Sequence, residues 1–227
     1  MTRKTRHTYH HAFAFALGSA LLAGCQQGAP VENAATGNDV GTMTMPVAGE
    51  GNEAMAPATT GGESQATAAR LAAIDAAVTR WETARDLPAA RRAAEEARNL
   101  VEGPNGPDYG DGDKDGKVAG ANSIGLLPGK NGEEALAQAS DGACVERDVL
   151  GGSWAKPGER WAILKTAIAD WSKSNNTFPA LPSHPQRIVG WASLTLNGAD
   201  LATAREYGGH ARMHIDVAKK AYADCAA

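Results

Sequence analysis

The stretch that decides the fold is residues 201–225, which read LATAREYGGHARMHIDVAKKAYADC. Small and apolar residues recur in it at alternating steps of three and four, the period of one helix face. They are Leu201, Ala204, Gly208, Ala211, Ile215, Ala218, Tyr222 and Cys225. So long a face predicts a helix laid along a bundle. Because glycine is a poor helix former, Gly208 indicates that a neighbouring helix approaches closely there.

The same period appears earlier in the chain, in a predicted helix that starts near Thr67. Its apolar stripe consists of Leu71, Ile74, Val78 and Trp81. A second helix is expected to follow, with Asp86 as its N-cap, Pro88 in its first turn and Gly103 as a left-handed C-terminal cap.

Ninety residues after the first helix, the stripe Trp161, Leu164, Ile168 and Trp171 repeats its spacing. The second stripe is followed by a further predicted helix, over about Pro185 to Leu196, and then by Gly198. The first stripe is likewise followed by a helix and then by Gly103. This pattern indicates two similar halves, although Ala-rich helices also resemble one another by composition alone. The fold class we expect is all-α, a bundle of about five or six helices with one long loop.

The N-terminus has the order of an export signal. Arg3, Lys4 and Arg6 precede an apolar run that ends in Leu-Ala-Gly-Cys at residues 22–25. This ending resembles the lipobox of bacterial lipoproteins. The resemblance implies that residues 1–24 are removed and that Cys25 is acylated on sulfur and nitrogen. An ordinary secretory signal with an incidental cysteine is the alternative.

Lipidation predicts a protein held to the cell envelope by its acyl chains, because more than one chain makes such an anchor stable. Gln26 stands where Asp favours inner-membrane retention in many Gram-negative bacteria, so the resemblance indicates the outer membrane. The membrane is therefore an expected partner, through the N-terminal lipid. The sequence does not identify a protein or other envelope partner of the domain.

The segment after the anchor predicts a flexible tether. Residues 26–66 contain no Lys, Arg or aromatic residue and are rich in Gly, Ala, Thr and Asn. Such a composition cannot bury enough apolar surface to offset chain entropy. We therefore expect a signal peptide at 1–24, a lipidated cysteine and tether at 25–66, and an α-helical domain at 67–227.

Composition excludes two classes of function. The chain of 227 residues has a formal net charge of −4, which becomes −7 once the three basic residues of the leader are removed. Nucleic acid is therefore not expected as a partner, because binding its phosphates needs a basic face. After the leader no apolar run of about 18 residues occurs, which excludes a multi-span membrane protein.

Two cysteines remain if Cys25 is lipidated. Cys144 and Cys225 form an even pair in a compartment that permits disulfides. A bond between them would close a loop of about 80 residues and stabilise the fold by a few kcal/mol. Two unpaired buried thiols are the alternative.

The long loop from Gly103 to Lys130 contains a candidate calcium site. Its sequence Asp-Gly-Asp-Lys-Asp-Gly-Lys-Val at 111–118 places oxygen ligands at positions 1, 3 and 5 and glycine at 6, as in an EF-hand loop. The candidate ligands are Asp111, Asp113, Asp115, the carbonyl of Lys117, and Asn122 at position 12.

Asn122 departs from the EF-hand pattern, which needs a bidentate Glu at position 12, and no helix is expected directly on either side. The loop is more similar to the shorter Asp-rich calcium loops of dockerin-like extracellular modules. A solvated acidic turn is the alternative, since turns are rich in Asp and Gly. Residues 99–118 also resemble a helix end and calcium loop of uncharacterised secreted helical bacterial proteins, a likeness that implies no activity.

A second candidate site is His210 and His214 on the last helix. Their spacing of four places both imidazoles on one helix face, where they could share a transition metal, or bind haem. His184 is the other histidine of the expected domain. Boundary histidines with ordinary hydrogen bonds are the alternative reading.

No catalytic constellation is recognisable in the sequence, so we do not expect an enzyme. Trp154 lies in a loop and is the best candidate for an exposed stacking platform. The expected function is that of a non-catalytic, lipid-anchored envelope protein with a structural calcium loop, acting by binding or scaffolding. The alternative is a transition-metal or haem carrier that uses His210 and His214.

Overall fold

The computed structural model describes residues 60–137 and 145–226 of the chain. The elements are α1 (Thr60–Glu82), α2 (Leu87–Glu102), the π-helical turn η1 (Val145–Leu150), α4 (Pro157–Ala169), the 3-10 turn η2 (Phe178–Ala180), α5 (His184–Leu196) and α6 (Leu201–Ala226). No strand is present in these two ranges. The prediction of an all-α fold with about five or six helices is confirmed.

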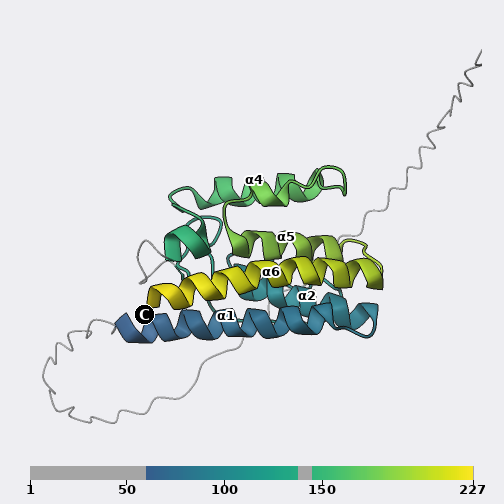
Figure 1. The fold of residues 1–227 in the computed structure, drawn as a ribbon, viewed down its shortest axis with the longest axis horizontal. Helices are drawn as coiled ribbons and strands as arrows, with labels where there is room; N and C mark the ends of the chain where they lie inside the picture. The colour runs from purple at the N-terminus through teal and green to yellow at the C-terminus, as the bar shows by residue number, and fades with distance from the viewer. Residues whose placement is uncertain (1–59, 138–144, 227) are drawn as a thin grey trace, which may run out of the picture. The chain divides into compact units, whose positions relative to one another are not determined.

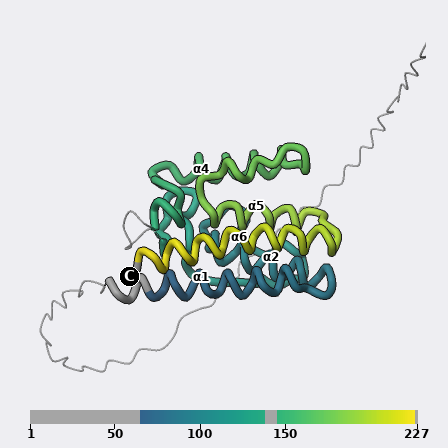
Figure 2. The backbone as a smooth tube through the Cα atoms, in the orientation of Figure 1, coloured from purple at the N-terminus to yellow at the C-terminus, as the bar shows by residue number. Residues whose placement is uncertain are grey.

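Four helices form the bundle. α1 packs against α2 and α6, and α5 packs against the same two helices. α4 lies outside this group and contacts α5 (Figure 1). The backbone trace shows α6 running beside α1 over most of its length, and α6 ends near the start of α1 (Figure 2). The long helix predicted for 201–225 therefore does lie along a bundle.

The apolar stripes predicted for α1 and α6 form the core. All four stripe residues of α1 are at most 2% exposed. On α6 the middle of the predicted face is buried, namely Ala204, Gly208, Ala211, Ile215, Ala218 and Tyr222. Because alanine and glycine occupy much of this face, the backbones of α1 and α6 can pack at short range.

α2 begins with the predicted N-cap and ends at the predicted glycine, but that glycine is not in the left-handed helical conformation. Asp86 accepts a hydrogen bond from the backbone N–H of Ala89 at 2.8 Å, and proline occupies the first turn. Gly103 ends the helix with a φ of 65° and donates its N–H to the carbonyl of Asn99. Its ψ of 177° is extended rather than left-handed helical. This turn directs the chain back along α2, where the long loop lies.

The start of the domain differs from the expected boundary. α1 begins at Thr60, so the helix extends into the segment 25–66 that we expected to be a tether. The residues that begin α1 include Gly61 and Gly62 and have no apolar period, so this part of the sequence does not predict a helix. The leader, Cys25 and Cys144 lie outside the described residues, and the predicted bond between Cys144 and Cys225 stays a prediction.

The two segments with similar stripes occupy unlike positions. α1 is a member of the bundle, whereas α4 packs on its outside and leaves Ile163 57% exposed. Trp171 lies beyond the end of α4 and packs edge to face against Trp191 and Tyr207. The structural roles of the two halves therefore differ.

The prediction that Trp154 forms an exposed platform is wrong. Its side chain is 8% exposed, and its indole N–H donates to the carbonyl of Leu150 at 2.9 Å. The ring packs on Trp161 with centroids 5.5 Å apart, and the guanidinium of Arg160 lies 4.3 Å from its centre. A loop position does not imply exposure when the indole N–H finds a buried acceptor.

Two adjacent glycines of α6 offer a test of the close helix packing. A Cβ on Gly208 would lie 2.9 Å from the backbone of Glu82 in α1, whereas one on Gly209 meets only the Glu82 side chain at 3.8 Å. We expect Gly208→Ala to destabilise the fold by about 1–3 kcal/mol through overpacking. Gly209→Ala should stabilise it by up to about 1 kcal/mol through helix propensity. Urea unfolding of both variants measures the difference, and equal shifts of the same sign would contradict the proposed contact.

Candidate metal centre

A buried polar stripe on α2 organises the long loop. Glu95, Arg98, Asn99 and Glu102 recur at helical spacing and are at most 6% exposed. The opposite side of α2 is built from alanines that join the core. Because buried polar groups must be hydrogen-bonded, this stripe requires a partner, and the backbone of the loop after Gly103 supplies it.

Glu95 is the centre of this arrangement. One carboxylate oxygen accepts the N–H groups of Gly112 and Asp113 at 2.7 and 2.9 Å. The other accepts the N–H of Ala119 at 2.7 Å. The side chain is fully buried. A single carboxylate therefore fixes both ends of the Asp-rich turn to α2.

Asn99 and Asn122 fasten the same turn one helical turn further along. The Asn99 amide donates to the carbonyls of Gly110 and Ala119 at 3.0 and 2.7 Å, and its oxygen accepts the N–H of Gly110. Asn122 donates to the carbonyl of Asn99 at 2.9 Å and to that of Gly120. The Asn122 amide thus binds backbone carbonyls, which makes it part of the support of the loop.

The loop approaches α2 so closely that only glycine fits at Gly120. It has a φ of 70°, and a Cβ there would lie 2.6 Å from the carbonyl oxygen of Glu96. Lys114 has a φ of 63°, which places the turn between the aspartates in the left-handed region. These constraints bring Asp111 and Asp113 over the buried end of Glu95.

The three carboxylates converge on one point. Glu95, Asp111 and Asp113 each offer an oxygen that lies within 4.8 Å of the other two. Oxygen ligands lie about 2.3–2.6 Å from calcium, so two ligands of one ion are at most about 5 Å apart. The geometry therefore suits a single hard cation, which would also relieve the repulsion of three neighbouring negative charges.

Asp115 is paired with an arginine of α2. One of its oxygens accepts from Nε and Nη2 of Arg92 at 3.1 and 2.8 Å, and the pair holds the pKa of Asp115 below its ordinary value. Its other oxygen accepts the N–H of Lys117 at 2.9 Å. Of the three predicted aspartates, Asp111 and Asp113 are thus in the cluster, with Glu95 in addition.

The aspartates also bond to the turn itself. Asp111 accepts the N–H groups of Asp115 and Gly116 at 3.1 and 2.9 Å, and Asp113 accepts that of Asp115 at 3.0 Å. These short-range bonds are typical of Asp in turns. They orient the carboxylates and leave lone pairs for an ion, since each carboxylate oxygen has two.

Sequence reasoning missed the role of Glu95 in this loop. A glutamate on an Ala-rich helix carries no motif by itself, and Glu95 is followed directly by a second glutamate, Glu96. The available signal was the spacing of Glu95, Asn99 and Glu102, three polar residues on one face of a helix whose other face is apolar. Such a face predicts a covering segment rather than solvent.

The histidines are arranged differently from the expected pair. His214 meets His184 of α5, with Nδ1 atoms 3.2 Å apart. His210 stacks on Trp191, with centroids 4.4 Å apart and planes at 16°. The spacing of four along α6 thus places the two imidazoles in different surroundings.

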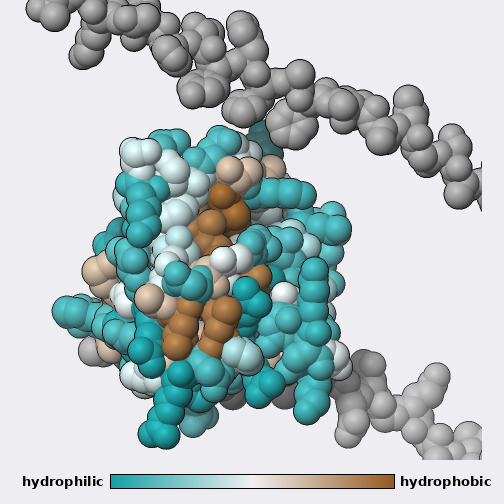
Figure 3. Space-filling model, turned by 90° about the vertical axis from the view of Figure 1, so that its right-hand side faces the viewer, coloured by the Kyte–Doolittle hydropathy of each residue, from teal (hydrophilic) through white to brown (hydrophobic). Residues whose placement is uncertain are grey.

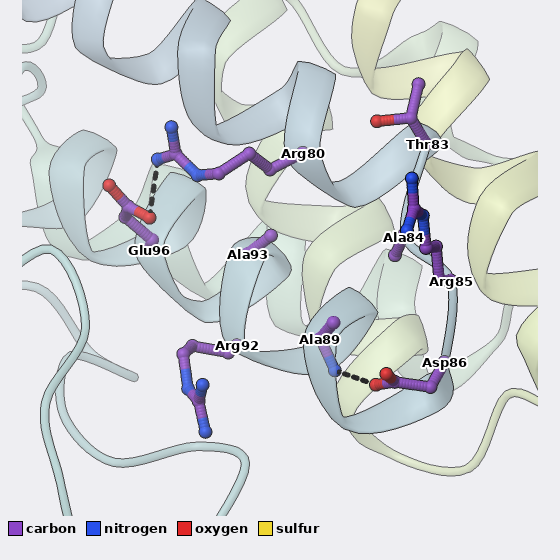
Figure 4. Close-up of a pocket in the computed structure, with 9 residues that line it drawn as sticks. All are labelled: Arg80, Thr83, Ala84, Arg85, Asp86, Ala89, Arg92, Ala93 and Glu96. Atoms are coloured by element: carbon purple, nitrogen blue, oxygen red, sulfur yellow. Dashed lines mark hydrogen bonds and ion pairs between the residues drawn. The ribbon is translucent and has the colours of Figure 1, made fainter.

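An open groove lies at the turn between α1 and α2. Its volume is about 430 Å³, and its lining includes Arg80, Asp86, Arg92 and Glu96 (Figure 4). Arg80 pairs with Glu96 at 2.7 Å. The end of the domain that contains this turn has mostly hydrophilic residues, with hydrophobic ones in a narrow strip (Figure 3). The charges of the groove are largely paired with one another or, through Arg92, with the Asp-rich loop.

No family model, no curated protein and no solved structure matches this chain. Among the helices of the described residues, none is long and apolar enough to cross a bilayer.

Burial gives Glu102 an unusual titration. The side chain is 1% exposed, and burial raises its pKa from 4.5 to about 8, opposed by the hydrogen bond from the N–H of Asp108. The nearby charge of Asp108 adds to the rise, and that of Arg98 opposes it. At neutral pH the folded protein therefore holds Glu102 largely protonated.

This titration predicts a pH dependence of stability. Between pH 4.5 and about 8 the unfolded chain has released the Glu102 proton while the folded protein keeps it, so the free energy of unfolding falls as pH rises. The slope is at most about 1.4 kcal/mol per pH unit. Glu102→Gln should reduce this slope of the free energy of unfolding against pH, whereas Glu96→Gln on the same helix should leave it unchanged. Parallel curves for wild type and Glu102→Gln in urea unfolding from pH 5 to 8 would contradict the assignment.

Proposed function

We propose that this protein is a lipid-anchored component of the cell envelope whose helical domain carries a structural calcium site on α2. The role is non-catalytic, and the domain acts by binding or scaffolding. The observation that carries the calcium site is the convergence of Glu95, Asp111 and Asp113 within 4.8 Å of one another, with Glu95 fully buried. The lipobox sequence at 22–25 supports the anchor.

Calcium fits this donor set better than a transition metal does. All three side chains are carboxylates, and hard cations prefer oxygen ligands. Calcium accepts 6–8 oxygens in a flexible geometry, so water and backbone carbonyls could complete the shell. Magnesium requires shorter distances and near-ideal octahedral geometry. The site is formed partly by an exposed loop, which suits the less demanding ion.

The long connection explains what the ion would stabilise. Residues 103–137 contain no helix or strand, and they cover the polar stripe of α2. A loop of this length inside a compact domain needs a specific source of order. A cation at Asp111 and Asp113 would hold the part of the loop that is most exposed, beside the anchor that Glu95 already provides.

Calcium should therefore stabilise the folded domain. With a dissociation constant of about 10⁻³ M, 10 mM calcium adds about 1.4 kcal/mol to the free energy of unfolding. We expect the Tm to rise by about 3–6 °C relative to protein in chelator. Asp111→Asn with Asp113→Asn should abolish the rise, and Glu134→Gln, an exposed glutamate of the same connection, should preserve it.

Arg92→Ala provides a second test of the site. Removing the guanidinium frees Asp115 to turn to the ion and removes a nearby positive charge, so calcium should bind about two- to fivefold more tightly. Isothermal titration calorimetry measures the change. If 10 mM calcium shifts the Tm of neither the wild type nor Arg92→Ala, the acidic turn is solvated and the calcium proposal fails.

The anchor is tested independently of the ion. We expect the protein to incorporate radiolabelled palmitate in its native host and to remain with membranes after a salt wash, because acyl chains are not released by screening charge. Cys25→Ser should abolish both. Mass spectrometry of the mature protein should find acylated Cys25 as its first residue, and an intact Met1 or an unmodified Cys25 thiol would rule out lipidation.

A further inference from the structure

Two histidines from different helices face each other beside the bundle core. His184 is the first residue of α5, held there by the N-cap Ser183, and His214 lies in the second half of α6. Their Nδ1 atoms are 3.2 Å apart, and their ring centroids 5.4 Å. Both side chains are half-buried.

The two rings cannot both be charged at this distance. One Nδ1 must donate a hydrogen and the other accept it, because two protonated nitrogens would repel each other. Burial lowers the pKa of His184, with Arg187 adding to the effect and Asp148 opposing it. Burial lowers the pKa of His214 to about 3, with smaller contributions from His184, Arg187 and His210. A neutral imidazole is the form that binds metals, so the separation of the two nitrogens decides whether they can share one ion.

The separation of the two nitrogens matches a pair of metal ligands. Zinc–nitrogen bonds are about 2.0–2.1 Å long, so two nitrogens on a tetrahedral zinc lie about 3.3 Å apart. We propose that His184 and His214 bind a divalent transition metal, of the zinc or copper class, between their Nδ1 atoms. Binding requires the ring that donates from Nδ1 to change tautomer: its hydrogen leaves Nδ1 for solvent and its Nε2 takes up another, so both ligands stay neutral and no net proton is released.

Charges of both signs lie near the pair. Arg187 of α5 lowers the pKa of both rings, and its guanidinium donates to the carbonyls of Pro179 and Leu181. Asp148 of η1 is the carboxylate whose charge acts on His184. Among the described residues, no carboxylate, thiol or other imidazole lies close enough to act as a third ligand beside the two histidines. Water or an external donor would fill the remaining positions, so the metal should exchange readily.

His210 provides the matched control. It lies one turn before His214 on the same helix, but its ring stacks on Trp191 at 4.4 Å. A site formed by sequence spacing would need His210 and His214, whereas the site proposed from the structure needs His184 and His214. Replacing one histidine at a time therefore distinguishes between these two possible sites.

The test measures zinc binding to the full-length chain. The parent protein carries substitutions that remove the metal donors of the N-terminal segment, namely His7→Gln, His10→Gln, His11→Gln and Cys25→Ser. We expect one zinc with a dissociation constant below about 100 µM. His184→Ala and His214→Ala should each weaken binding at least about tenfold. His210→Ala, and the pair Asp111→Asn with Asp113→Asn, should leave the affinity within about twofold of the parent chain.

Nuclear magnetic resonance of the histidine side-chain nitrogens keeps the test independent of variant stability. Zinc should shift the Nδ1 signals of His184 and His214 and leave that of His210 in place. The proposal is overturned if zinc does not bind below about 100 µM. The proposal is also overturned if zinc binding is lost in His210→Ala but kept in His184→Ala. The same holds if zinc binding is lost only in the variant with Asp111→Asn and Asp113→Asn.

Discussion

The fully buried carboxylate of Glu95 is the constraint on which the loop and the candidate site depend. A buried charge is costly unless hydrogen bonds surround it, and three backbone N–H groups from the loop do so here. The same bonds force residues 112–119 to wrap around one point of α2. Asp111 and Asp113 therefore lie beside Glu95 because the loop backbone satisfies that residue.

This arrangement makes α2 a helix with two buried faces. Its alanines pack into the bundle, and its polar stripe binds the loop. The bundle fixes the position of α2, α2 fixes the loop, and the loop then presents its aspartates at the surface. An ion bound there would add its free energy to a structure already held by hydrogen bonds, so it would stabilise the domain without being needed to fold it.

The domain thus offers two kinds of donor at separate places. The carboxylate cluster on α2 suits a hard cation, and the histidine pair between α5 and α6 suits a borderline transition metal. Both depend on contacts between one helix and the segment or helix that follows it, 16 to 30 residues along the chain. Glu95 lies on a bundle helix, and so do both histidines, which gives each site a rigid base.

The sequence by itself determined the all-α fold, the residues at which α2 begins and ends, and the buried apolar faces of α1 and α6, because the period of small and apolar residues and the capping residues Asp86 and Gly103 act over a few neighbouring positions. It also indicated Asp111 and Asp113, since three aspartates at alternate positions form a local motif. Only the tertiary structure decided that Glu95 joins them, that Asp115 pairs with Arg92, and that His214 meets His184. These pairings depend on which helix faces pack together and on how the loop satisfies a buried charge, and neither is encoded in the spacing of residues along one segment.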